Sequence, residues 1–366
     1  MDVKKTVLYD DHLANSAKMA PFAGFLLPIQ YQSIIAEHNA TRKAATLFDT
    51  CHMGEFRIHH GDALSDLEKL LTCSIRTLEV GRCRYGLMCN PRGGVIDDQI
   101  IYRVGENDFF MVVNAATRQD DYIWIGSRLS KNTRIEDISD ETAKIDLQGP
   151  GSPKIMRKLM DRPIDGMRYF DFAYNQYQGT RVLTSRTGYT GEVGFEIYCD
   201  TDLVSKLWND CLDLGAKPAG LGARDTLRLE MCLPLYGHEL SGDRNAAESN
   251  LTYCIARDKP FIGSPAVLDE SVRRFSLAAI VLESRRAARA RDLVLDEAGV
   301  EVGVITSGSF SPSLGKGIAL GYVLARYNQP GATLKIKTER QELTGTVSDM
   351  PFYKHATGRK RLDEFL

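Results

Sequence analysis

Hydrophobic positions along this chain follow two different spacings. Residues 61–71, GDALSDLEKLL, repeat leucine every three or four positions behind Asp62, a residue able to cap, which predicts an amphipathic helix. Other short runs are rich in β-branched and aromatic residues and are bounded by turn formers. They predict strands at residues 96–103, 109–114, 181–186, 194–199, 277–282, 300–306 and 333–337. Because helical and strand patterns are mixed instead of alternating as βαβ units, the sequence predicts an α+β protein.

The pattern changes near residues 265–276, and we place a domain boundary there. Beyond it the chain consists mainly of short strand patterns separated by glycine and proline turns, which predicts a small β-rich domain over residues 275–366, with a barrel as a candidate. The preceding region, residues 1–270, holds the mixed patterns. A basic stretch near the start of the second region is interpreted as a solvated turn; it contains Arg285, Arg286, Arg289 and Arg291.

Length and charge narrow the class of protein. A chain of 366 residues is too long for one ordinary core and indicates two or three domains. Hydrophobic residues make up 43% and charged residues 26%, which is typical of a globular protein. The net charge of -2 offers no field for nucleic acid or an anionic membrane surface, so neither is expected as a partner.

The cysteines and the N-terminus point to a reducing compartment. None of the eight cysteines forms a Cys-x-x-Cys pair or a zinc-type cluster, so we expect separate reduced thiols and no metal site. The first residues lack an apolar signal core, and no stretch approaches the roughly 18 apolar residues of a membrane span. The sequence therefore predicts a soluble cytoplasmic protein.

Common nucleotide and hydrolase motifs are absent from the sequence. There is no Gly-x-Gly-x-x-Gly after an N-terminal strand and no Gly-x-x-x-x-Gly-Lys-Ser/Thr loop, so flavin, nicotinamide and nucleoside triphosphate chemistry are unsupported. There is also no His-Glu-x-x-His and no Gly-x-Ser-x-Gly. His52 is interpreted as a structural histidine, and Cys51 as a small buried residue instead of a nucleophile.

Two aspartates interrupt an otherwise strand-like segment, NPRGGVIDDQIIY at residues 90–102. Side chains alternate along a strand, so Asp97 shares a face with Val95, Gln99 and Ile101. Asp98 then shares the other face with Ile96, Ile100 and Tyr102. Aspartate is depleted in strands and seldom buried unless paired, so at least one of the two requires a partner or a functional role.

Two glycine-rich segments are open to more than one interpretation. Residues 186–197, RTGYTGEVGFEI, suit a turn against a flat ligand, but their spacing favours an ordinary hairpin. Residues 220–236 predict a glycine loop entering a helix that Pro234 stops. Arg224 and Arg228 lie on one face of that helix, where salt bridges are the favoured interpretation.

Taken together, longer pieces of the chain carry a family resemblance over nearly its whole length. They are EHNATRKAATLFDTCHMGEF, YGLMCNPRGGVIDDQIIYRV, VVNAATRQDD, LQGPGS, SRTGYTGEVGFEIY, GLGARDTLRLEMCLPLYGHEL, DKPFIG and ITSGSFSPSLGKGIALGYV. The chain resembles the folate-dependent aminomethyltransferases, the T-proteins of the glycine cleavage system. The resemblance implies a three-part, cloverleaf-like molecule with tetrahydrofolate in a central hole. Residues 1–270 would form two intertwined α+β subdomains that bind folate, and residues 275–366 the β-barrel.

The resemblance also implies roles for single residues. Asp97 would face the folate nitrogens at which the one-carbon unit is transferred, and its alternative is a surface aspartate opposite Gln99. Asp98 would lie on the more apolar face, tied to backbone or to an arginine. Glu196 would accept the paired N–H donors of the pteridine edge, with Arg224 as its partner. The other residues expected at the pocket are Tyr85, Asn114 and Tyr189, with Tyr236 and Tyr353 as candidates for either rim or core.

The implied reaction moves a methylene unit from an aminomethyl group to tetrahydrofolate and releases ammonia. The donor would sit on the dihydrolipoyl arm of a carrier, the H-protein. Phe25 stands where the family commonly has tryptophan, and Cys51 where serine is usual. Residues 244–263 depart more strongly, although Glu248 is kept. The donor therefore has an alternative, a small methylated sulfur or ether compound. A folate-binding protein without transferase activity would carry a Lys-Gly-Cys signature, which is absent.

Overall fold

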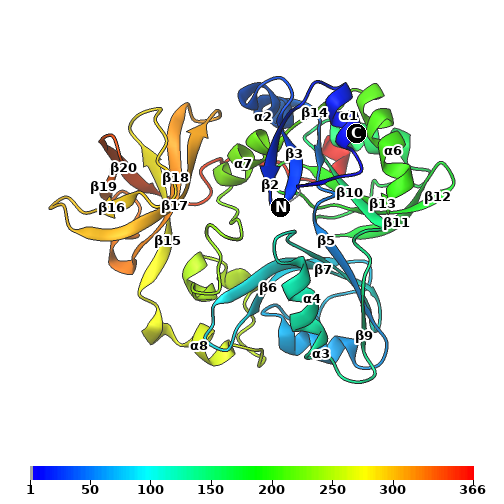
Figure 1. Cartoon of the computed structure of the whole chain (residues 1–366), viewed down its shortest axis with the longest axis horizontal. Helices are drawn as coiled ribbons and strands as arrows, with labels where there is room; N and C mark the ends of the chain where they lie inside the picture. Colours follow the sequence, from blue (N-terminus) through cyan, green and yellow to red (C-terminus); the bar gives the residue numbers. More distant parts are fainter. Residues whose placement is uncertain (1–2) are drawn as a thin grey trace.

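The computed structural model describes residues 3–366, which form three lobes, one around each large sheet (Figure 1). The first lobe contains a six-stranded sheet, the second a five-stranded sheet and the third a closed barrel. Helices and strands are mixed through the first two lobes, and the barrel comes last in the sequence. The predicted α+β class with a C-terminal barrel is therefore confirmed.

The first lobe is built on a sheet whose strands come from distant parts of the chain. Its order is β11 (Phe172–Tyr177), β12 (Thr180–Ser185), β13 (Gly194–Asp200), β10 (Thr142–Gln148), β4 (Thr46–Asp49) and β14 (Lys217–Pro218). Its helices are α1 (Tyr9–Ala14), α2 (Ile34–Lys43), α5 (Ser152–Leu159), α6 (Thr201–Asp213) and α7 (Leu221–Glu230). A small N-terminal sheet joins β1 (Lys4–Lys5), β3 (Phe25–Gln30) and β2 (Lys18–Phe22). Trp208 of α6 is fully buried in the core beneath the large sheet.

The second lobe is a five-stranded sheet with different neighbours on its two faces. Its order is β6 (Cys83–Cys89), β7 (Val95–Gly105), β8 (Asp108–Val113), β5 (Gly54–His59) and β9 (Arg134–Asp137). One face packs against α3 (Ala63–Leu70) and α4 (Arg118–Gly126), through a core that includes Ile101. The other face packs against the first lobe, where Tyr102 lies in one cluster with Tyr198. The sheet therefore has a helix face and a central face.

A β-bulge decides which aspartate of β7 lies on which face. Val95 pairs with Cys89 and Asp97 with Met88, which leaves Ile96 as the extra residue. Ile96 packs on the helix face, so the expectation that it shares a face with Asp98 is wrong. Beyond the bulge, Asp97, Gln99 and Ile101 point to the helices, whereas Asp98, Ile100 and Tyr102 point to the first lobe.

The third lobe closes as a barrel, and the chain then returns to the first lobe. The barrel order is β15 (Phe275–Leu282), β18 (Lys316–Leu324), β17 (Glu301–Ser311), β16 (Leu293–Leu295), β19 (Thr333–Lys337) and β20 (Glu342–Ser348). The segment before it contains α8 (Ser264–Leu268) and the 3-10 helices η1 (Ala246–Ser249), η2 (Thr252–Cys254) and η3 (Glu270–Val272). After β20, Leu362 joins the core of the first lobe, and Arg186 donates to the carbonyl of Gly358 at 3.3 Å. The division into 1–270 and 275–366 stays a prediction.

The sequence patterns predicted a hairpin and two helices of the first two lobes, but not where each helix begins and ends. The hairpin is confirmed, because β12 and β13 pair with Ser185 opposite Glu196. The predicted helix is α3, but the side chain of Asp62 makes no capping hydrogen bond. Pro234 does not stop α7, which ends at Glu230 before Cys232 adopts a left-handed φ of 54°. No helix among residues 3–366 is long and apolar enough to cross a membrane. The expected cytoplasmic location stays a prediction.

Candidate functional site

Asp98 is the partly exposed carboxyl group on the central face of the second lobe. Its Oδ2 accepts the hydroxyl hydrogen of Tyr85 from β6 at 3.0 Å. Its Oδ1 accepts an amide hydrogen of Asn114, just beyond β8, at 2.8 Å. The expected arginine partner is therefore wrong, because a phenol and an amide occupy the carboxylate. Three residues predicted from the sequence, or their direct neighbours, thus converge on this one group.

The environment of Asp98 raises its pKa toward neutral pH. Burial, followed by the negative charge of Asp97, raises the pKa of Asp98 to about 7. The hydrogen bonds from Tyr85 and Asn114 act in the opposite direction. A carboxyl group with a pKa near the working pH can both accept and return a proton during a reaction.

Asp97 does not face the centre, contrary to the expectation. It is 0% exposed and points to the helix face, as does Ile101 four positions later. Its Oδ2 accepts the backbone N–H of Asn114 at 3.0 Å, and its Oδ1 accepts the Asn114 amide at 2.8 Å. A ligand at the centre would meet Asp98 and Asn114 first, because the backbone of β7 separates it from Asp97.

Aromatic side chains face the same carboxyl group from other elements. Tyr189, in the loop between β12 and β13, has its pKa raised by burial and also by the charge of Asp98. Tyr236, beyond α7, has its pKa raised to about 12 by burial and by the charges of Asp97, Asp121 and Asp98. Tyr253 of η2 is 73% exposed, and η2 packs against β6. The motif reasoning passed over Tyr253, whose position in the divergent segment 244–263 was the available signal.

A buried ionic network, called the ionic wall below, lies in the first lobe on the side of Tyr189. Lys144 Nζ lies 2.5 Å from Asp146 Oδ1 and 3.0 Å from Glu196 Oε1. Asp146 and Glu196 are direct neighbours on the paired strands β10 and β13. Arg224 Nη1 lies 2.8 Å from Asp146 Oδ2, and its guanidinium lies 5.0 Å from the centre of the Tyr189 ring. Lys144 and Asp146 were missed by the sequence reasoning, although opposite charges two positions apart share one face of a strand.

Glu196 and Arg224, the two charged residues predicted to bind the ligand, differ in how many of their hydrogen-bonding groups are unoccupied. Glu196 is 4% exposed, and its Oε2 already accepts from Thr187 at 2.6 Å and from Tyr102 and Tyr198 at 3.3 Å each. Its Oε1 accepts only from Lys144 and keeps one acceptor site. The Arg224 side chain is 15% exposed and has Asp146 as its one acceptor within the described residues. Arg224 therefore offers its remaining N–H groups to a ligand.

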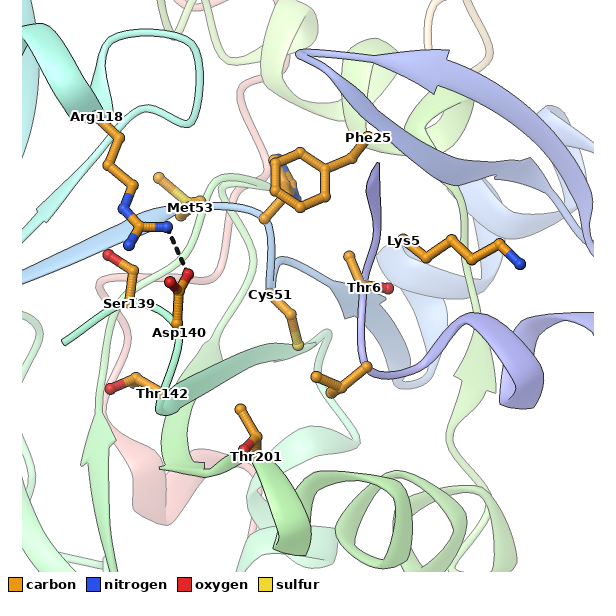
Figure 2. Close-up of a pocket in the computed structure, with 12 residues that line it drawn as sticks. Lys5, Thr6, Phe25, Cys51, Met53, Arg118, Ser139, Asp140, Thr142 and Thr201 are labelled. Atoms are coloured by element: carbon orange, nitrogen blue, oxygen red, sulfur yellow. Dashed lines mark hydrogen bonds and ion pairs between the residues drawn. The ribbon is translucent and has the colours of Figure 1, made fainter. Parts of the chain in front are cut away.

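Cys51 and His52 belong to a separate cavity of about 140 Å³, shown in Figure 2. Phe25 lines this cavity, and Arg118 pairs with Asp140 along one side of it (Figure 2). Burial raises the pKa of the Cys51 thiol well above its usual value and lowers the pKa of His52 to about 4. Both groups are thus neutral at pH 7, which supports their interpretation as structural residues.

Two further residues named from the sequence have structural partners. The Tyr353 ring lies 4.0 Å from the Arg42 guanidinium, in the network around Glu230. Glu248 accepts the backbone N–H groups of Arg274 and Phe275, where the barrel begins. Among residues 3–366, no three side chains of His, Cys, Asp or Glu gather as a metal site, and the cysteines described there are free thiols.

Comparisons with known proteins cover nearly the whole chain. Residues 8–259 match the GCVT N-terminal domain, and residues 276–354 match the glycine cleavage T-protein C-terminal barrel domain. The aminomethyltransferase of Desulforamulus reducens is 40% identical over 96% of this chain and 99% of its own length. That of Thermotoga neapolitana is 39% identical over 98% and 100%. The crystal structure of glycine cleavage system aminomethyltransferase T from Bartonella henselae superposes with a TM-score of 0.92 at 28% identity, covering 97% of this chain and 99% of that one.

Proposed function

Because the chain belongs to the glycine cleavage T-protein family, we propose that it transfers a methylene unit from a lipoyl-bound aminomethyl group to tetrahydrofolate and releases ammonia. It is an aminomethyltransferase, and the family is folate-dependent and works with the H-protein. The acting residues are those around Asp98, the partly exposed carboxyl group on the central face, and this exposure is the observation that carries the proposal.

The proton balance of this reaction requires a group such as Asp98. The N5 and N10 nitrogens of tetrahydrofolate each lose a proton as they bond to the transferred carbon. The leaving amine and the leaving thiolate each gain one. We assign to Asp98 the acceptance of a folate proton and its return to a leaving group, which its pKa of about 7 allows. Tyr85 and Asn114 hold the carboxylate in place meanwhile.

Tetrahydrofolate is proposed to lie between the central face of the second lobe and the ionic wall of the first. Tyr85, Tyr189 and Tyr236 would pack on its rings, and Asn114 would border them. Arg224 would donate to the pteridine acceptors, and the remaining acceptor site of Glu196 would take a pteridine N–H. The family dependence on folate and the free donors of Arg224 support this placement.

A turnover assay with an aminomethylated lipoyl carrier protein tests the proposed function. We expect ammonia and methylene-tetrahydrofolate to appear together in equal amounts, and neither to form without tetrahydrofolate. Product from a small methylated sulfur compound, with none from the carrier, would contradict the proposal and transfer the donor role to that compound.

Replacing Arg224 by Met is expected to weaken tetrahydrofolate binding by about 10- to 100-fold, because hydrogen bonds to a charged group contribute roughly 1.5–3 kcal/mol. The matched control is Arg57→Met, which removes an arginine that pairs with Asp108 at 3.1 Å on the exposed side of the second lobe. Calorimetric titration with tetrahydrofolate measures both. Equal affinities of the Arg224 variant and the control would remove Arg224 from the binding site.

The arginine-rich turn after β15 is the proposed contact for the carrier, through acidic side chains that we expect on the carrier's docking face. Arg285, Arg286, Arg289 and Arg291 are all exposed, and within residues 3–366 none of their guanidinium groups pairs with a carboxylate, although the backbone N–H of Arg289 donates to Asp292 at 2.7 Å. The turn is joined to the start of β18 through the bond from Gly317 N–H to the Ser284 carbonyl. The connection between β17 and β18 contacts α7, since Ser313 donates to Glu230 at 2.8 Å. The turn thus lies at the end of the barrel that meets the first lobe.

Replacing Arg286 and Arg289 together by Gln is expected to raise the KM for the carrier about tenfold at low salt, since exposed charges mainly affect association. The KM for tetrahydrofolate should not change. Arg128→Gln, on the second lobe beyond α4, serves as the control. A carrier KM equal to that of the control, at every salt concentration, would show that this turn does not dock the carrier.

A further inference from the structure

Asp121 of α4 is a buried carboxyl group that the proposed mechanism does not use. It is 0% exposed, and neither of its oxygens accepts a hydrogen bond from any donor in residues 3–366. No basic side chain lies within 4.0 Å of it in this part of the chain. An ionised carboxylate without donors is costly to bury, so Asp121 requires a proton of its own.

Asp97 lies beside Asp121 and has the complementary set of contacts. Burial, followed by the charge of Asp121, raises the pKa of Asp97 well above its usual value. Burial also raises the pKa of Asp121, and because the two carboxyl groups titrate together, the N–H donors around them decide which one keeps the charge. Each Asp97 oxygen accepts an N–H of Asn114, which an ionised carboxylate does best. Two neighbouring buried carboxyl groups cannot both ionise, so they share one proton.

We propose that Asp121 holds this proton and donates it to Asp97, and that Asp97 acts as a positioning residue that aims the amide of Asn114 at Asp98. This inference rests on the proposed function of Asp98. An asparagine amide has two hydrogens. One goes to Asp97 Oδ1 at 2.8 Å and the other to Asp98 Oδ1 at 2.8 Å. The backbone N–H and the first amide hydrogen of Asn114 are both bonded to Asp97. The orientation of the amide is therefore fixed, and its second hydrogen points to Asp98.

The pair also sets the charge that Asp98 experiences. The Asp97–Asp121 pair is faced by Asp98 on β7, by Asp120 in α4 and by Thr117 just before α4. Tyr236, beyond α7, also faces the pair, because, after burial, the charges of both Asp97 and Asp121 raise its pKa. Because the charge of Asp97 raises the pKa of Asp98, a protonated Asp97 would lower the pH at which Asp98 ionises. The proton on Asp121 thus keeps the charge on Asp97.

Two variants of Asp121 in the full chain test the proposal. Asp121→Leu removes the donor, so Asp97 takes the proton itself and loses one of its two acceptor oxygens. We expect kcat to fall about tenfold, the cost of one misplaced hydrogen bond, with the KM for tetrahydrofolate unchanged. The acid limb of the kcat profile should move down by roughly one pH unit, because Asp98 loses a charged neighbour. Asp121→Asn supplies an N–H donor in place of the O–H and should restore both kcat and the acid limb.

An infrared measurement provides a readout that does not depend on activity. At pH 8 the wild type should show the carbonyl band of a protonated carboxyl group that Asp121→Asn lacks. Glu55, a buried carboxyl without donors, contributes the same background to both proteins. Wild-type kcat and pH profile in Asp121→Leu, failure of Asp121→Asn to restore them, or identical infrared bands would each overturn the proposal. If the proposed function were wrong instead, Asp98→Asn would turn over normally while the infrared difference remained.

Discussion

Asp98→Asn is expected to lower kcat for methylene transfer by about 10²- to 10⁴-fold, the range that general acid–base groups contribute. Asparagine keeps the shape of the side chain and can still accept from Tyr85, which donates to Asp98 at 3.0 Å. It cannot accept a folate proton or balance positive charge at N5. Binding of tetrahydrofolate should survive, because the ionic wall and the tyrosines remain. The loss therefore appears in kcat and not in the KM for tetrahydrofolate.

The pKa of Asp98 determines the direction in which kcat should change with pH. Burial and the charge of Asp97 raise the pKa of Asp98 to about 7, so the ionised form, which accepts the proton, is lost as the pH falls through that value. Wild-type kcat should decline below about pH 7, and the residual activity of Asp98→Asn should lack this limb. Asp108→Asn is the matched control, since Asp108 pairs with Arg57 on the exposed side of the same lobe. Near-normal turnover of Asp98→Asn would remove Asp98 from the chemistry.

Lys144→Met is expected to destabilise the protein by about 3–5 kcal/mol, the cost of leaving buried charges uncompensated. Lys144 is 1% exposed and pairs with both Asp146 and Glu196, which are themselves buried. Methionine matches its length but leaves Asp146 with Arg224 and the Thr50 hydroxyl, and Glu196 with hydroxyl donors alone. The substitution should also weaken folate binding, because it loosens the wall that positions Arg224.

Urea unfolding of Lys144→Met against Lys206→Met measures the effect. Lys206 makes an exposed pair with Asp210 at 3.0 Å, which should contribute at most about 1 kcal/mol. Lys144 and Arg224 lower the pKa of Asp146 against the opposing effect of its burial. The stabilisation from Asp146 is thus present above its unfolded pKa and is lost as the pH falls through the lower folded value. The difference between Lys144→Met and wild type should shrink in acid, and a loss no larger than that of Lys206→Met would contradict the account.

The strands and the barrel could be predicted from the sequence because their signals are local. Residues 333–337 read as a strand and form β19 with the same bounds. The alternation of β7 also predicted that its two aspartates lie on opposite faces. Alternation does not show which face of the strand the helices cover, because α3 and α4 come from other parts of the chain. The family resemblance assigned Asp97 to the centre, and alternation alone offered no check on that choice; the structure has Asp98 there.

The other features that the sequence did not predict also depend on contacts between distant segments. Ile96 changed face because of a bulge opposite Met88, which no local pattern marks. The spacing of Lys144 and Asp146 indicates opposite charges on one strand face. Their role in the ionic network depends on Glu196 and Arg224, which lie further along the chain. No local pattern distinguishes Asp121 from its neighbour Asp120, and its burial becomes evident only once α4 is packed against the five-stranded sheet.

A crystal structure of the chain with tetrahydrofolate tests the central claim most directly. The account predicts the pteridine between Asp98 and the ionic wall, with N5 or N10 within hydrogen-bond reach of the Asp98 carboxylate and no ligand atom against Asp97. Tetrahydrofolate bound with both nitrogens turned away from Asp98, or bound at another site, would contradict it.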